Sequence, residues 1–390
     1  MKKIVITVAL LCVAILFVAC NRQEEPDPLP HSTPTSIGHA PALTIDTATG
    51  TPAGEYIYQA VEILAADNSQ AATIVRYHLQ TGKASYLCQD PYCDHKTDSC
   101  PFFMREVGGN GVAFIGDTVF FVRQSEQGIH SICAYDAKST KITMLYEDEF
   151  IVADLKVYQY SLYYSLVRED HYAVYRYDVG KDESEWVFGV IGGEIQKIEN
   201  DWIYTRNLYG KTAIYDLNGK KVSGVRQNDY RGYVYRLKDW TMTHGWRDFV
   251  AAYERTPAGS EQWQTVLERI SVPLMVNDSI VYYLPIPLDE QKKYNWDEGN
   301  PTYDIYGGRV YIAKLDGSEN RLLCHAEDCI IIQDGSELYS GDWMGIRIAK
   351  CVVDANGNRT DRRSDLLLVN LKTGEYHVSR FDTGEEVIGW

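Results

Sequence analysis

Short apolar segments separated by polar turns recur along most of the chain. In the first half of the recurring unit, a turn of Asp, Asn or Gly leads into aromatic and β-branched residues, as in residues 116–121 (GDTVFF) and 277–283 (NDSIVYY). Long stretches of helical periodicity are scarce by comparison. Runs of this length and composition, bounded by turn residues, predict β-strands, so we expect an all-β fold.

The second half of the unit is a strand, a tight turn and another strand. Examples are residues 77–83 (YHLQTGK), 214–220 (IYDLNGK) and 313–318 (AKLDGS). Asn-Gly and Asp-Gly are strong hairpin signals because both residues tolerate positive φ. Each unit is therefore expected to hold three or four antiparallel strands.

The spacing of the unit predicts the architecture. Its first half recurs near residues 55, 117, 161, 201, 239, 278 and 335. Most steps are about 40 residues, and a period of ~40–50 residues with three or four strands is typical of a β-propeller. We expect a β-propeller of seven blades over residues 51–390, with six or eight blades as alternatives because some copies are weak.

The first twenty residues follow a different pattern. Two lysines precede an almost entirely apolar segment, residues 4–19, and Cys20 follows the small residue Ala19. This is the arrangement of an export signal, and a Cys at that point resembles the lipobox of bacterial lipoproteins. We expect residues 1–19 to be a lipoprotein signal peptide and Cys20 to be lipidated. An uncleaved membrane anchor is the alternative, although about sixteen apolar residues fall short of the ~20 that span a bilayer.

Residues 20–50 are polar and rich in Pro, Ser and Thr, which predicts a flexible tether behind the lipid. The formal net charge of the chain is −16. An acidic surface repels phosphate backbones and anionic head groups, so we expect no nucleic-acid partner. Attachment to the membrane would come from the lipid on Cys20, which predicts an extracytoplasmic, lipid-anchored location.

The sharpest local motif spans residues 88–101 (CQDPYCDHKTDSCP). It holds Cys88, Cys93, His95 and Cys100, and three Cys with one His form a known structural zinc set. A disulfide is the alternative, because exported proteins often pair their cysteines. Seven of the nine cysteines remain once the leader and Cys20 are set aside, and an odd number argues against complete pairing. The motif favours zinc, and either arrangement would hold a loop at a blade edge.

The remaining cysteines carry weaker signals. Cys133 and Cys351 lie in apolar segments and are expected in the core. Residues 324–329 (CHAEDC) are open to two interpretations, a small disulfide bridge or weak metal binding.

Residues 87–95 (LCQDPYCDH) and 100–102 (CPF) sit in a Tyr-rich repeat chain behind a lipobox. In this respect the chain resembles uncharacterised β-propeller surface lipoproteins of anaerobic Gram-positive bacteria. The resemblance implies the fold and the surface location, and it implies no activity.

Motifs for catalysis are not evident. We find no Gly-x-Ser-x-Gly elbow, no Gly-rich phosphate loop and no His-Glu-x-x-His, and we assign no catalytic residues. Side chains expected in blade loops could instead stack on sugars or grip peptides. The candidate ligand-binding residues are His244, Trp246, Trp296 and Trp343.

Taken together, the sequence favours a non-catalytic ligand-binding or scaffold protein at the cell surface. Its partner would be a glycan, a peptide or an envelope protein. One alternative is a polysaccharide-active propeller enzyme, a glycosidase or lyase with carboxylates in the central funnel. Another is a structural subunit of an envelope complex, and the fold alone does not choose between them.

Overall fold

The structure of the protein is a computed structural model. It describes residues 54–105, 111–125, 127–168, 171–181, 183–191, 193–199, 201–207, 212–222, 229–230, 232–243, 248–270, 272–276, 278–285, 306–331, 338–353 and 359–381. The predicted signal peptide and tether lie outside these ranges. Within them, no helix has the length and apolar character needed to cross a lipid bilayer.

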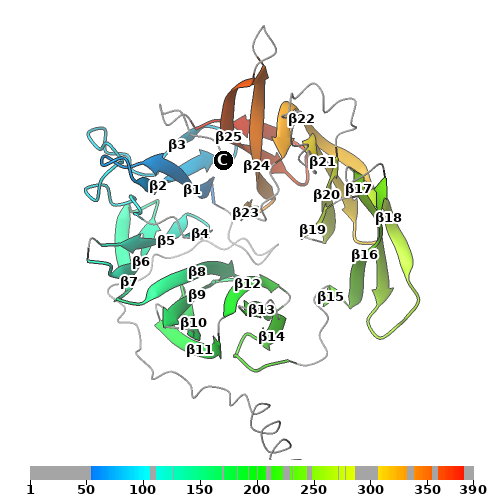
Figure 1. Ribbon diagram of the computed structural model, residues 1–390, viewed down its shortest axis with the longest axis horizontal. Coiled ribbons are helices and arrows are strands. Elements are labelled where there is room, and N and C mark those ends of the chain that lie inside the picture. Colours follow the sequence, from blue (N-terminus) through cyan, green and yellow to red (C-terminus); the bar gives the residue numbers. More distant parts are fainter. Residues whose placement is uncertain are drawn as a thin grey trace, which may run out of the picture.

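The described residues form seven antiparallel blades arranged in a ring (Figure 1), which confirms the predicted seven-bladed β-propeller. Blade 1 contains β1 (Tyr56–Leu64), β2 (Gln70–His78) and β3 (Ala84–Tyr86). Blade 2 contains β4 (Val112–Ile115), β5 (Thr118–Gln124), β6 (His130–Asp136) and β7 (Lys141–Asp148). Blade 3 contains β8 (Ile151–Tyr158), β9 (Ser161–Arg168), β10 (His171–Asp178) and β11 (Glu183–Ile191).

The chain continues round the ring in the same way. Blade 4 contains β12 (Gly193–Glu199), β13 (Trp202–Asn207) and β14 (Thr212–Asp216). Blade 5 contains β15 (Asp229–Tyr230), β16 (Tyr233–Thr243), β17 (Asp248–Pro257) and β18 (Gln264–Ile270). Blade 6 contains β19 (Val272–Val276), β20 (Ser279–Pro285), β21 (Tyr306–Lys314) and β22 (Arg321–Ile331). Blade 7 contains β23 (Leu338–Ser340), β24 (Trp343–Val353), β25 (Arg359–Asn370) and β26 (Tyr376–Ser379).

The predicted hairpin turns lie where the sequence placed them. Gly219 and Gly317 have φ of 80° and 84°, the left-handed region that glycine enters without strain. One weak copy of the unit differs, because residues 238–242 lie inside β16 rather than at a turn. The turn that enters β16 contains Gly232, with φ of 80°. A register shift between Lys238 and Thr241 interrupts the strand there.

The first strand of blade 1 corresponds to the second strand of blade 2. Glu55 O accepts the N–H of Leu79 at 2.9 Å, as Asp117 O accepts the N–H of Ala137 at 3.0 Å in blade 2. The three strands of blade 1 therefore correspond to the second, third and fourth strands of blade 2. It follows that β3 is the outer strand of blade 1.

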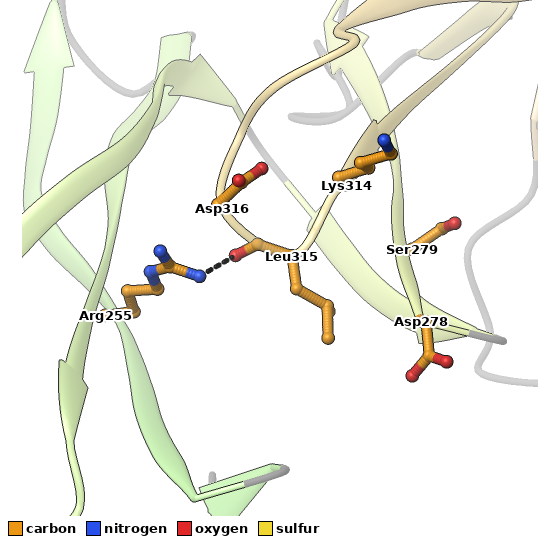
Figure 2. Close-up of a pocket in the computed structure, with 6 residues that line it drawn as sticks. All are labelled: Arg255, Asp278, Ser279, Lys314, Leu315 and Asp316. Atoms are coloured by element: carbon orange, nitrogen blue, oxygen red, sulfur yellow. Dashed lines mark hydrogen bonds between the residues drawn. The ribbon is translucent and has the colours of Figure 1, made fainter.

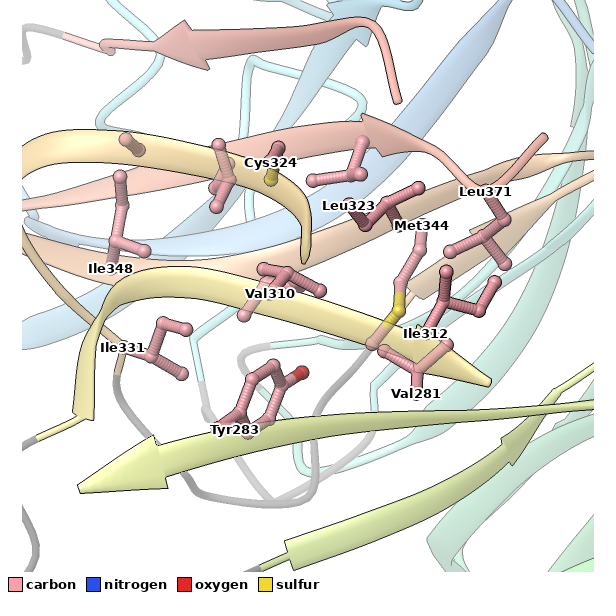
Figure 3. Close-up of a cluster of buried hydrophobic side chains, with 14 of the residues drawn as sticks. Val281, Tyr283, Val310, Ile312, Leu323, Cys324, Ile331, Met344, Ile348 and Leu371 are labelled. Atoms are coloured by element: carbon pink, nitrogen blue, oxygen red, sulfur yellow. The ribbon is translucent and has the colours of Figure 1, made fainter. Parts of the chain in front are cut away.

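The hydrophobic core lies between neighbouring blades. Among the described residues, buried clusters join blades 1 and 2, 2 and 3, 3 and 4, 5 and 6, 6 and 7, and 7 and 1. Figure 3 shows the cluster between blades 6 and 7, where Val310 and Ile331 of blade 6 lie near Met344 and Ile348 of blade 7. Burial of these apolar faces holds the blades together, since it removes their surface from water. Blades 6 and 7 also share one sheet, through hydrogen bonds between β22 and β24.

Candidate metal centre

The cysteine motif is an excursion from the outer strand of blade 1. After β3, Leu87 donates its N–H to Ile74 O of β2 at 2.8 Å, and the chain then leaves the sheet. It returns at Met104, which exchanges two backbone hydrogen bonds of 2.9 Å with Ala72. Residues 88–103 therefore interrupt the outer strand, and we call residues 88–105 the cysteine loop.

Short turns fold the cysteine loop back on itself. The N–H of Tyr92 donates to Asp90 Oδ1 at 2.9 Å, and the N–H of Cys93 donates to Asp90 O at 3.2 Å. A second turn follows, in which Asp94 Oδ1 accepts the N–H of Lys96 at 3.0 Å. Asp side chains favour turns because they hydrogen-bond the backbone two residues further on.

The structure brings all four predicted ligands together. One ligand atom from each of Cys88, Cys93, His95 and Cys100 lies within 4.8 Å of the other three. The Sγ of Cys100 is 3.8 Å from Nδ1 of His95. Zinc–sulfur bonds of about 2.3 Å in a tetrahedron place the sulfur atoms about 3.8 Å apart, so small shifts would complete such a site. Among the described residues, no other set of three or more His, Cys, Asp or Glu side chains converges in this way.

The four side chains of this set are partly shielded from solvent. Cys88 and Cys100 are buried, and Cys93 and His95 are half-buried. The two buried thiols share a hydrophobic cluster with Phe102, Phe103 and Met104, just C-terminal to them. A full set of four protein ligands is typical of structural metal sites, whereas catalytic sites keep one position for water or substrate.

Burial also sets the protonation of the ligands. Desolvation raises the pKa of the Cys100 thiol to about 12, and it raises the pKa of Cys88 as well. Desolvation lowers the pKa of His95, which keeps its imidazole neutral and able to ligate a metal. A metal must therefore displace protons from the thiols, and its affinity rises with pH.

The ends of the cysteine loop are tied to other parts of the fold. Phe102 contacts two rings of blade 2, Phe121 at 5.5 Å and Tyr135 at 4.9 Å between ring centroids. Arg105 forms an ion pair with Asp98. The tip of the loop faces solvent, and Tyr92 is 95% exposed. The base of the loop is thus held by contacts with the fold, whereas its tip is exposed to solvent.

The second thiol pair behaves differently. Cys324 and Cys329 are both buried in the cluster between blades 6 and 7, where Figure 3 labels Cys324. Cys324 is a free thiol, so the interpretation of residues 324–329 as a disulfide bridge is wrong in this structure. Burial raises the pKa of Cys324 to about 12.

Of the four predicted ligand-binding residues, one lies within the described ranges. Trp343 begins β24, is 5% exposed, and stacks on His377 with ring centroids 5.8 Å apart. Its ring packs in the cluster between blades 7 and 1. His244, Trp246 and Trp296 lie outside the described residues, and the ligand-binding role of all four stays a prediction.

A shallow pocket lies between blades 5 and 6 and was not foreseen from the sequence. It has a volume of about 430 Å³ and mixed charge, with Arg255, Asp278, Lys314 and Asp316 among its lining residues (Figure 2). Arg255 donates to Leu315 O at 3.1 Å, and Lys314 pairs with Glu319. These two cations are therefore engaged within the protein.

A buried carboxyl group lies on the innermost strand of blade 3. Asp154 Oδ2 accepts hydrogen bonds from Ser165 Oγ at 3.1 Å and from the N–H of Ile195 in blade 4 at 3.3 Å. Burial raises the pKa of Asp154, Lys156 opposes this shift, and the charge of Glu194 adds to it. No local sequence pattern marks this group, because its environment depends on how two blades meet.

Comparison with known proteins supports the fold and goes no further. No protein-family model matches the chain, and neither does any curated protein. Among solved structures, the chain is similar to an acylaminoacyl peptidase in complex with Z-Gly-Gly-Phe-chloromethyl ketone, at 11% identity and a TM-score of 0.50. That match covers 85% of this chain and 51% of the peptidase, so the chain spans about half of its length.

Two other propeller structures are similar at the same low level. The β-propeller domain of the Trilobed protease from Pyrococcus furiosus is 12% identical, with 87% of this chain and 96% of that chain covered and a TM-score of 0.48. A puromycin-hydrolyzing peptidase from Mycobacterium tuberculosis is 12% identical, with 90% and 56% covered and a TM-score of 0.47. At this level of identity, a structural likeness carries no information about activity or substrate.

Proposed function

We propose that this protein is a lipid-anchored, extracytoplasmic β-propeller that acts as a non-catalytic binding or scaffold protein at the cell surface. The observation that carries the proposal is the cysteine loop. Four proposed ligands converge at the base of the loop. The side chain of Tyr92, at the tip, is almost fully exposed to solvent. An exposed aromatic ring on a braced loop suits contact with a glycan, a peptide or an envelope protein.

The same proposal assigns one structural Zn²⁺ to Cys88, Cys93, His95 and Cys100. When bound, the metal would cross-link the beginning and the end of the cysteine loop. Without the metal, turns and side-chain packing hold the shape of the loop. Metal analysis of the protein purified under reducing conditions tests this assignment. We expect one zinc per chain, loss of zinc in Cys88→Ser, and retention in Cys133→Ala, a control that alters a buried thiol of blade 2. Metal-free protein with a disulfide inside the loop would contradict it.

Location rests on Cys20 and is tested separately. Replacing Cys20 with Ser should release the protein from the membrane fraction of the producing cell, because the lipid is proposed to be its main attachment. Unchanged membrane association of Cys20→Ser would contradict lipid anchoring.

Binding can be tested with glycan and peptide arrays. The purified protein should retain at least one ligand, and Tyr92→Leu should weaken that binding without loss of zinc. Silence on both arrays, together with capture of a single envelope protein by pull-down, would favour a subunit of an envelope complex instead.

A second candidate function is favoured by Asp154. A carboxyl group with a raised pKa, close enough to Glu194 for its charge to be felt, is a feature of glycoside-cleaving sites. If the protein cleaves polysaccharide, Asp154→Asn should abolish product release from a panel of polysaccharides while zinc content stays unchanged. No cleavage by the unaltered protein across the panel would exclude this candidate for those substrates.

A further inference from the structure

The ring closes between blades 7 and 1 without a shared strand in the described part of the chain. Their strands belong to separate sheets, and β1 lies beside β23. Hydrogen bonds between described residues of the two blades cross this seam. Gly54 N–H donates to Ser340 Oγ at 3.2 Å, and Ser379 Oγ donates to Gly82 O. Side-chain packing also joins the two blades, through a cluster containing Ile57, Val75, Tyr77, Leu79, Trp343, Leu366 and Leu368.

The approach of the two blades is close at Gly82. This residue has φ of 65°, and a Cβ added there would lie 2.6 Å from Cβ of His377 in blade 7. Only glycine fits such a position without a shift of one blade. The two blades are therefore tightly packed at this point, and side chains of both blades hold the seam together.

An aromatic path connects the proposed metal ligands to this seam. The ring of His95 stacks on that of Tyr86, with centroids 3.8 Å apart and an angle of 28° between the planes. Tyr86 in turn meets Phe381 edge-on, at 4.7 Å and 89°. Tyr86 ends β3 of blade 1, whereas Phe381 follows β26 of blade 7 and packs against the cluster of the seam.

In this aromatic path, His95 is the residue that a bound metal would contact directly. It has φ of 61°, a region that residues other than glycine enter only when their surroundings hold them there. Coordination through one ring nitrogen would fix the plane of the imidazole, and this plane is the surface on which Tyr86 stacks. Coordination would add a bond that holds the ring in this plane, beyond its contacts with Tyr86 and with Cys100 Sγ.

We propose that metal binding at the cysteine loop stabilises the closure of the propeller ring, acting through His95, Tyr86 and Phe381 on the seam between the first and last blades. This inference rests on the proposed metal centre and extends its role from one loop to the whole ring. Loss of metal opens the seam more often, and the effect is greatest at β26, the outer strand of blade 7.

Hydrogen–deuterium exchange tests the inference directly. The purified protein is compared with zinc bound and after removal of zinc by a chelator, both under reducing conditions. Zinc should slow exchange in peptides covering residues 376–381 by about two- to tenfold, the range that one aromatic pair supplies. Peptides covering β17, in blade 5, are the internal control and should not change.

Matched variants separate the path from the metal itself. Phe381→Leu removes the ring on the far side of the seam and touches no proposed ligand, so it should keep zinc but lose the effect of zinc on residues 376–381. Tyr86→Leu removes the ring that stacks on His95 and should also lose the effect of zinc on residues 376–381. Tyr92→Leu, an exposed tyrosine in the same loop, should retain both zinc and the effect.

The outcomes distinguish the two proposals. A protein that binds no zinc overturns the metal centre and the seam coupling together. Zinc that is bound but slows exchange only within residues 84–105 overturns the coupling alone. The coupling is also overturned if Phe381→Leu and Tyr86→Leu show the same zinc effect as Tyr92→Leu.

Discussion

Segments at the outer edges of blades 1 and 6 carry cysteine pairs with the same spacing. The segment in blade 1 is a loop, whereas the segment in blade 6 is a strand. In blade 1, Cys88 and Cys93 converge with His95 and Cys100 on one point. In blade 6, Cys324 and Cys329 lie within β22, in the core between two blades. Cysteine spacing alone therefore does not make a metal site.

The difference lies in whether the chain leaves the sheet. Between Cys88 and Cys93, Asp90 makes a turn by accepting the N–H groups of Tyr92 and Cys93. Residues 324–329 instead stay within β22, which pairs with β21 up to Ala326, shifts register over residues 327–329, and pairs with β24 from Cys329 onward. A turn lets ligands from one short segment face one another, whereas a strand directs successive side chains to opposite faces of the sheet.

The largest expected effect separates the two sites by their dependence on zinc. Cys100→Ser should remove zinc and, when zinc is present, lower the free energy of unfolding by more than the ~0.5–3 kcal/mol of most point substitutions, because loss of a metal is one of the causes of larger effects. Chemical denaturation with and without chelator measures this effect. If Cys100→Ser lowers the free energy of unfolding equally with and without zinc, the cysteine loop is not a metal centre.

The corresponding change in blade 6 should behave as an ordinary core substitution. Cys324→Ala leaves a small cavity beside Val310 and Ile331, and we expect a loss of about 2 kcal/mol that does not depend on zinc. The same denaturation series gives the answer. A zinc-dependent loss in Cys324→Ala would show that the second pair also binds metal and would remove the contrast.

Alkaline pH should sharpen the comparison. The folded pKa of Cys324 is raised from 9.0 to about 12, so its contribution to stability is fully present below pH 9 and is lost as the pH rises toward 12. The stability advantage of the unaltered protein over Cys324→Ala should shrink across this range, by at most ~1.4 kcal/mol per pH unit. With zinc bound, the thiols of the cysteine loop are already deprotonated, so Cys100 should add no loss of this kind. A constant advantage from pH 9 to 12 would contradict the buried state of Cys324.

The smallest expected effect concerns the turn that distinguishes the two segments. Asp90→Ala removes the acceptor for the N–H of Tyr92 and should destabilise the zinc-bound loop by about 0.5–1 kcal/mol. Competition with a zinc chelator should show a two- to fivefold weaker affinity, the change that this energy corresponds to. Asp216→Ala, which breaks a similar turn at Asn218 in blade 4, is the control and should leave zinc affinity unchanged.

The repeat pattern predicted the fold because each blade closes with local turns. Asp316-Gly317 and Asn218-Gly219 mark hairpins through residues adjacent in the sequence, and these turns formed as expected. The copy near Asp239 was misplaced, because polar residues inside β16 imitate a turn and only pairing with β17 reveals the strand. The four proposed ligands were found for the same local reason, since they fall within thirteen consecutive residues.

Contacts between distant parts of the chain were not predictable from the sequence. Tyr86 and Phe381 meet only because the ring closes, and no local pattern marks either residue as a contact of the other. Asp154 is similar, since its buried state depends on the N–H of Ile195 in the next blade. Sequence patterns identified the blades and the proposed ligands, whereas the seams between blades follow from three-dimensional packing.

X-ray absorption at the zinc edge tests the central claim most directly, because it reports the atoms bound to the metal. For the purified protein with zinc, we predict three sulfur atoms at about 2.3 Å and one nitrogen at about 2.0 Å. A shell of oxygen and nitrogen without sulfur, or protein that retains no zinc after purification under reducing conditions, would contradict a closed metal centre in the cysteine loop.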